Sequence, residues 1–126
     1  MTVSVDSEQT TLENYSTEIK EKCKDFSDLL DSIDALGDKK KRLWKEIYEN
    51  ALTDRQNAYA IFIRLCKIVK DDSSEHAIHG KTMATFVERM SKANEQLIRL
   101  AELIAKEESK SQAIDPDDLF DRINSQ

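Results

Sequence analysis

Glycine and proline are nearly absent from this 126-residue sequence, which contains only Gly37, Gly80 and Pro116. β-Sandwiches and β-barrels need many tight turns, and such turns draw heavily on both residue types. Two isolated glycines also cannot form a phosphate-binding loop or a dinucleotide fingerprint. The composition therefore argues against predominantly β folds and nucleotide-binding α/β folds, and it favours an all-α fold in a single small unit.

Cysteine and long apolar stretches are also scarce. The two cysteines, Cys23 and Cys66, lie far apart in the sequence, so we expect reduced thiols on apolar helix stripes and no metal or redox pair. No apolar run approaches the roughly 18 residues of a membrane span. The opening residues, MTVSVDSEQT, have neither the basic nor the apolar region of a secretory leader. We therefore expect a cytosolic protein without a membrane partner.

The charges are unevenly distributed around a net charge of −6. Residues 1–36 contain three lysines and nine acidic residues, whereas residues 37–70 contain nine basic and four acidic residues. A nucleic-acid contact would therefore have to use the basic segment. Alternating charge of this kind is also typical of helices that pair with each other or with copies of themselves.

The first long amphipathic segment precedes Gly37. Thr10 and Glu13 form a capping-box pattern that predicts a helix start, with frayed residues before it. Apolar side chains then recur at intervals of three and four, typical of one helix face; they are Leu12, Tyr15, Ile19, Cys23, Phe26, Leu29, Leu30, Ile33 and Leu36. We expect Gly37 to end this helix in a left-handed conformation, and Asp38 to cap the next one. Residues 1–37 thus form an acidic helical arm.

Two longer helical segments follow. The first extends from Asp38 to about residue 70 and contains a second capping-box pattern at Thr53, where it either kinks or runs through. Because neither Gly nor Pro lies nearby, a continuous or gently bent helix is favoured. Asp72 and Glu75 then predict a turn and a new helix start, with the helix ending near residue 108. Residues 38–109 therefore predict a long antiparallel helical hairpin that mediates oligomerisation.

The second hairpin helix contains an apolar row with alternating steps of four and three residues, the repeat of a left-handed coiled-coil seam. We predict that this row packs the hairpin or joins subunits; it consists of Met83, Val87, Met90, Asn94, Leu97, Ala101 and Ile104. Phe86, Ala93, Ile98 and Leu100 widen the apolar face, so we expect at least two neighbouring helices. Asn94 either is buried and fixes the register, or lies at the edge of the seam and bonds to water.

A polar linker and a short helix occupy residues 110–126. Pro116, flanked by aspartates, is a strong helix start, but the helix that it opens is barely two turns long. Leu119, Phe120 and Ile123 lie on one side of it. Because so short a helix is not stable alone, it either packs on its own domain or docks on a partner, and the polar linker favours docking.

Candidate catalytic or metal-binding groups are few. His76 and His79 lie one helical turn apart beside Glu75, but they lack the motif and the further ligands of a zinc site. We expect ordinary polar residues here, and no enzyme activity, cofactor or small-molecule substrate. The neighbouring Gly80 either admits another helix closely or is tolerated near a fraying helix end.

The most pronounced charge feature follows Gly37. Its residues occupy the first turns of a predicted helix, where the helix dipole disfavours cations; they are Lys39, Lys40, Lys41, Arg42 and Lys45, here called the basic cluster. One interpretation is salt-sensitive, sequence-independent contact with nucleic-acid phosphates. The other is a solvated cluster that offsets the acidic first helix, which contains Asp25, Asp28, Asp31 and Asp34.

Residues 43–106 resemble the central helical hairpin of small terminase subunits from T4-like tailed phages. Five segments underlie the resemblance: LWKEIYEN at 43–50, AIFIRL at 60–65, the acidic turn KDDSSEH at 70–76, MATFVERM at 83–90 and ANEQLIRL at 93–100.

The resemblance implies a DNA-packaging accessory protein in the host cytoplasm. Such subunits assemble into rings through the central helical pair, help to recognise viral double-stranded DNA, and stimulate the ATPase of the large terminase subunit. They have no nucleotide-hydrolysing site of their own. By this analogy the predicted seam packs the hairpin or the subunit contact, and the short terminal helix contacts the large subunit.

A second hypothesis belongs to a different class of protein. It is a cytosolic coiled-coil adaptor or scaffold, dimeric or tetrameric, with no nucleic-acid role. The ring hypothesis requires an accessible basic cluster and a large oligomer. The adaptor hypothesis predicts a small closed bundle and no salt-dependent DNA binding.

Overall fold

The computed structural model describes residues 5–70, 72–112 and 116–125, and every regular element in these ranges is a helix. This confirms the predicted all-α fold. No helix in the described ranges is both long enough and apolar enough to cross a membrane. The four helices are α1 (Val5–Asp31), α2 (Asp38–Val69), α3 (Ser73–Gln112) and α4 (Pro116–Asn124).

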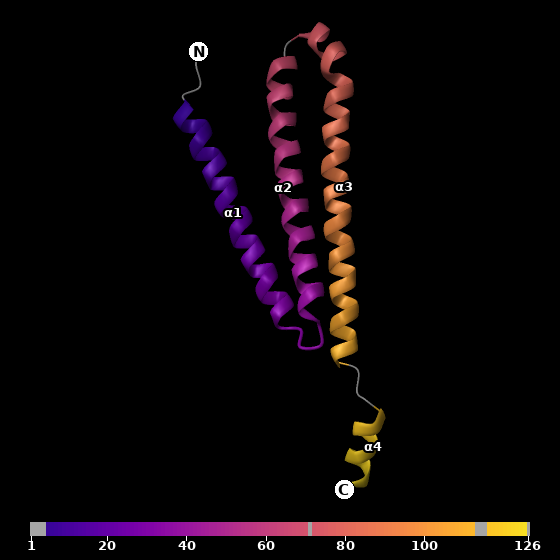
Figure 1. Ribbon diagram of the computed structural model, residues 1–126. Helices are drawn as coiled ribbons and strands as arrows, with labels where there is room; N and C mark the ends of the chain where they lie inside the picture. Colours follow the sequence, from indigo (N-terminus) through magenta and orange to yellow (C-terminus); the bar gives the residue numbers. More distant parts are fainter. Residues whose placement is uncertain (1–4, 71, 113–115, 126) are drawn as a thin grey trace.

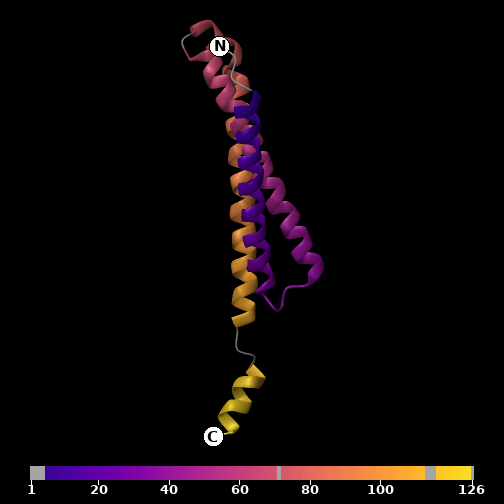
Figure 2. The ribbon, with the colours of Figure 1, turned by 90° about the vertical axis from the view of Figure 1, so that its left-hand side faces the viewer.

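The helices α2 and α3 form an antiparallel hairpin, which is the longest feature of the molecule (Figure 1). Helix α1 runs antiparallel to α2, lies against it near the α1–α2 connection, and diverges from it toward the N-terminus. Figure 2 shows the beginning of α2 to one side of α1 and α3, so the three helices surround a core at that end. Helix α4 lies beyond the end of α3, away from the other helices (Figure 1).

The core lies where α1, the connection, α2 and α3 meet. Phe26 of α1 stacks on Tyr48 of α2, with ring centroids 4.1 Å apart and planes 5° from parallel. Further along the hairpin, α2 and α3 bury Ala51, Ala58 and Ala93, small residues that permit close helix packing. The buried side chains of the core are Phe26, Leu30, Ile33, Leu36, Trp44, Leu100 and Ile104.

Helix α3 turns one row of side chains toward the other helices, with alternating steps of four and three residues. All members are buried or half-buried; they are His79, Met83, Phe86, Met90, Ala93, Leu97, Leu100, Ile104 and Glu107, here called the inward row. The 3.5-residue repeat predicted for this helix is therefore a packing row within the chain.

The α1–α2 connection differs from the prediction. Helix α1 ends at Asp31 and does not continue to Leu36; Ile33 and Leu36 lie in the connection, with their side chains buried in the core. Gly37 has φ −68° and ψ 151°, an extended conformation, and it occupies the N-cap position of α2. The predictions of a left-handed Gly37 and of a cap at Asp38 are therefore wrong. The apolar residues keep a helical spacing past the end of α1 because Ile33 and Leu36 of the connection pack in the same core.

Helix α1 also begins earlier than predicted. It starts at Val5, so that residues 5–10, expected to be frayed, are helical, and the capping-box residues Thr10 and Glu13 lie inside the helix. Helix α2 is continuous through Thr53, as predicted. Neither of these capping-box patterns marks a helix boundary in this chain.

Asp72 caps the start of α3. Its Oδ1 accepts hydrogen bonds from the Ser74 backbone N–H at 2.9 Å and from the Ser74 hydroxyl at 2.7 Å. These bonds hold the pKa of the Asp72 carboxyl below its ordinary value. Glu75, predicted as the reciprocal half of a capping box, instead has a carboxylate oxygen 3.0 Å from His79 Nε2. The cap predicted at Asp72 is confirmed.

Leu30 and Leu29 provide a matched pair for testing the core. Leu30 is fully buried, whereas Leu29 is 42% exposed. We expect Leu30→Ala to lower the free energy of unfolding by about 2 to 5 kcal/mol, because it leaves a cavity in the core. Leu29→Ala should cost much less. Urea denaturation followed by circular dichroism measures both, and equal losses would contradict the core assignment.

Replacing Asp72 with alanine should lower Tm at neutral pH, because α3 loses its cap. The carboxyl has a lower pKa in the folded than in the unfolded chain, so its stabilisation is present above the unfolded pKa and is lost as the pH falls through the folded pKa. The Tm values of the wild type and Asp72→Ala should therefore converge in acid. A difference that persists there would argue against this cap.

Candidate functional site

The basic cluster lies at the start of α2, and the chain's own carboxylates engage much of it. Lys41 Nζ lies 3.9 Å and Lys45 Nζ 3.5 Å from Asp31 Oδ1 at the end of α1. Lys40 Nζ lies 3.4 Å from Glu107 Oε1 on α3. These three lysines therefore connect α2 to both neighbouring helices, which supports the structural interpretation of part of the cluster.

Lys39 and Arg42 differ from the other cations of the cluster. Both are exposed, and neither forms an ion pair with any residue in the described ranges. Because they are three positions apart on a helix, they share one face of α2. The structure thus reduces the candidate phosphate contact to these two side chains.

The predicted seam separates into two groups. Four members lie on the inward row: Met83, Met90, Leu97 and Ile104. The other three are exposed: Val87, Asn94 and Ala101. The prediction that these residues pack in the hairpin is wrong for Val87 and Ala101, because Phe86 and Leu100 take that role. Asn94 is exposed and meets α2 through a hydrogen bond. The alternative role of all three, contact between subunits, stays a prediction.

Asn94 forms a polar contact across the hairpin. Its side-chain oxygen accepts a hydrogen bond of 2.9 Å from Arg55 Nη1 on α2, and the residue is exposed. A buried Asn94 that fixes the register from inside a seam is therefore excluded. Its partner is a side chain of α2.

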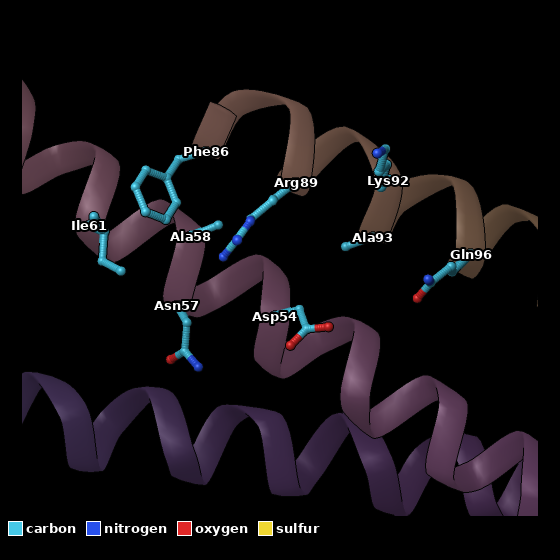
Figure 3. A pocket seen from close by; sticks show the side chains of 9 residues that line it. All are labelled: Asp54, Asn57, Ala58, Ile61, Phe86, Arg89, Lys92, Ala93 and Gln96. Carbon is cyan, nitrogen blue, oxygen red and sulfur yellow. The ribbon is translucent and has the colours of Figure 1, made fainter. Parts of the chain in front are cut away.

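A groove of about 380 Å³ lies between α2 and α3, and the sequence did not indicate it. Ile61 of α2 and Phe86 of α3 approach each other there, and Arg89 points from α3 toward α2 (Figure 3). The Arg89 guanidinium carbon is 5.5 Å from the centroid of the Phe86 ring. The available signal was the position of the cations Arg89 and Lys92 beside the apolar residues Phe86 and Ala93 in the sequence. The lining residues, here called the hairpin groove, are Asp54, Asn57, Ala58, Ile61, Phe86, Arg89, Lys92, Ala93 and Gln96.

The candidate docking helix α4 exposes its apolar side. Phe120 is 67% and Ile123 is 64% exposed, and the side chain of Leu119 lies outside those that the structure describes. The alternative in which α4 packs on its own domain is not the arrangement seen here (Figure 1). Docking on a partner stays a prediction.

The surroundings of the histidines, Gly80 and the cysteines in the described residues suit structural roles. His79 contacts Glu75, and no group of three or more metal-ligand side chains occurs among the described residues. No atom lies within 4 Å of a Cβ placed on Gly80, so no described residue makes the close approach considered for it. Cys23 and Cys66 are free and half-buried, and burial, assisted by the charge of Glu49, raises the pKa of the Cys23 thiol.

Comparison with family models, curated proteins and solved structures finds no match to this chain.

Two double variants separate the structural cations of the basic cluster from the candidate phosphate-binding ones. Lys41→Ala/Lys45→Ala should lower the free energy of unfolding by up to about 1 kcal/mol per pair, since both lysines contact Asp31. Lys39→Ala/Arg42→Ala should leave stability unchanged but abolish salt-sensitive DNA binding. Urea denaturation and fluorescence anisotropy with a labelled duplex measure the two effects. DNA binding that survives Lys39→Ala/Arg42→Ala would exclude this face.

Proposed function

We propose that this chain is a non-enzymatic accessory protein of viral DNA packaging, a small terminase subunit that acts in the host cytoplasm. It assembles into a ring, contacts viral double-stranded DNA and stimulates the ATPase of the large terminase subunit. It uses no cofactor, small-molecule substrate or membrane.

The observation that most supports assembly is the uncovered apolar surface of the hairpin. Helix α1 faces α2 from the connection to about the middle of the hairpin, where Tyr15 and Ile19 line a groove with Thr53 and Ala60, and then diverges from it. In the described ranges, the remaining part of the hairpin consists of α2 and α3 alone. Large apolar side chains remain exposed on both of its helices, including Tyr59 and Ile61 on α2 and Val87 and Ile98 on α3. Exposed apolar surface of this extent is typical of an interface.

The resemblance to small terminase subunits concerns this same part of the chain. Residues 43–106 span most of α2 and α3, together with the turn capped by Asp72. The hairpin that resembles the ring-forming element is therefore also the element with uncovered apolar side chains. This coincidence favours subunit assembly through α2 and α3.

The contacts with DNA and with the large subunit fall on separate parts of the chain. Lys39 and Arg42 are the proposed phosphate contacts, since the other cations of the cluster have partners within the chain. Phe120 and Ile123 on α4 are the proposed docking residues for the large subunit, together with Leu119. A short amphipathic helix beyond the main body suits this kind of contact.

The adaptor hypothesis is favoured by one observation. Lys40, Lys41 and Lys45 form ion pairs within the chain, which lowers the positive charge available to a nucleic acid. In this alternative the hairpin forms a dimer or tetramer and does not bind DNA.

The absolute mass in solution separates the two hypotheses. Light scattering on a sizing column, at low and moderate salt, should show one large discrete assembly of many subunits. A dimer or tetramer would favour the adaptor. A monomer would contradict both, because the exposed apolar faces would then have no partner.

Deleting residues 114–126 tests the role of α4 separately. The truncated chain should assemble to the same mass as the wild type, because the hairpin is intact. It should no longer stimulate the ATPase of the large terminase subunit. Phe120→Ser/Ile123→Ser in the full chain should have the same effect, and unchanged stimulation would remove α4 as the docking element.

A further inference from the structure

The outward flank of α3 has a second regular row of residues. Its members are all exposed, and their spacing alternates between three and four residues from one end of the helix nearly to the other. None of them is charged, in a chain in which 35% of residues are charged. They are Ala77, Gly80, Ala84, Val87, Ser91, Asn94, Ile98, Ala101 and Ala105, here called the outward row.

The spacing of the outward row is that of a coiled-coil seam. Alternating steps of three and four keep a row facing one partner helix along its whole length. The inward row has the same repeat and already packs within the chain. In the outward row, Asn94 accepts a hydrogen bond from Arg55 of α2, and Ala101 and Ala105 line a groove with Phe26 and Leu29 of α1. The large apolar members are nevertheless in the open: Val87 is 47% and Ile98 is 60% exposed. Solvated helix faces normally have charged residues. The uncharged row therefore indicates an absent helical partner.

Charged residues border the outward row on one side. Glu88, Glu95 and Glu102 follow one another at intervals of seven, which places them along one edge of it. Charges at the edges of a seam select the partner and its orientation. A partner for this flank of α3 should therefore present an apolar surface bordered by cations.

The hairpin groove has that chemistry. Ile61 and Phe86 form its apolar part, and its charged residues are the cations Arg89 and Lys92 and a single acid, Asp54. Lys92 already lies 3.4 Å from Glu88 of its own chain, so Arg89 is the cation without an ion pair in the described ranges. The groove thus offers apolar side chains to the outward row and one unpaired cation, Arg89, to its acidic edge, in which Glu88 is already paired with Lys92.

We propose that the outward row of one copy binds in the hairpin groove of a second copy. The surfaces lie at the same level of the hairpin, because Phe86 of the groove and Val87 of the outward row are consecutive in α3. Copies can therefore pack side by side without an axial shift. Since the contact joins two different surfaces, it is heterologous, and its repetition builds a ring or an open array. This inference rests on the proposed assembly and specifies which surfaces form it.

Mixing two defective variants tests this contact. Val87→Glu/Ile98→Glu disables the outward row and leaves the groove intact, whereas Ile61→Glu disables the groove and leaves the outward row intact. Each variant alone should be monomeric by light scattering. An equimolar mixture should form a dimer of twice the chain mass and nothing larger, because only one of the two possible contacts is intact.

Controls separate this result from misfolding and from failure of the proposed function. The substituted residues Val87, Ile98 and Ile61 are all at least 40% exposed, so circular dichroism should show unchanged helix content. Ala84→Glu provides a second variant of the outward row, because Ala84 is also exposed. Thr17→Glu adds the same charge to an exposed position on α1 and should leave the wild-type mass unchanged. If the wild type assembles but the mixture stays monomeric, the surface assignment is overturned while assembly stands. A monomeric wild type would overturn assembly itself.

Discussion

One neighbouring helix can cover only one seam of α3, and this limit determines the rest of the architecture. The helix is 40 residues long and has two uncharged or largely uncharged rows on different flanks. The inward row packs on α2 and, near the α1–α2 connection, on α1. Helix α1 diverges from the hairpin toward its N-terminus (Figure 1). It comes close only to the last members of the outward row, since Ala101 and Ala105 line a groove with Phe26 and Leu29, and every member of the row stays exposed. The chain therefore forms a local three-helix core and a hairpin with exposed apolar side chains on its outer surfaces.

The sequence predicted the period of the seam correctly, but it could not determine the phase. Met83, Met90, Leu97 and Ile104 belong both to the predicted seam and to the inward row. At the intervening positions the seam can use either of two neighbouring residues, for example Ala93 or Asn94, and Leu100 or Ala101. All four residues are uncharged, so the sequence does not favour one phase over the other. Only the position of α2 and α1 distinguishes them. The same limit explains the α1–α2 connection, where Ile33 and Leu36 keep a helical spacing because they reach the core from a non-helical segment.

The sequence could not predict long-range ion pairs either. Lys40 and Glu107 are 67 positions apart, and their contact depends on the register of the whole hairpin. Local chemistry was more predictable: Asp72 caps α3 as expected, and the exposed side of α4 follows from its helical spacing. The candidate DNA-binding site is therefore smaller than the sequence predicted. Tertiary contacts removed lysines from the proposed DNA surface and left Lys39 and Arg42.

Photocrosslinking from the outward row tests the central claim most directly. With benzoylphenylalanine in place of Val87 in the full chain, the crosslinked peptides identify the residues that face this position in the assembly. We expect adducts between copies at the hairpin groove, around Ile61 and Arg89. Adducts to the outward row of another copy would show a symmetric dimer instead, and adducts confined within one chain would contradict an intermolecular seam.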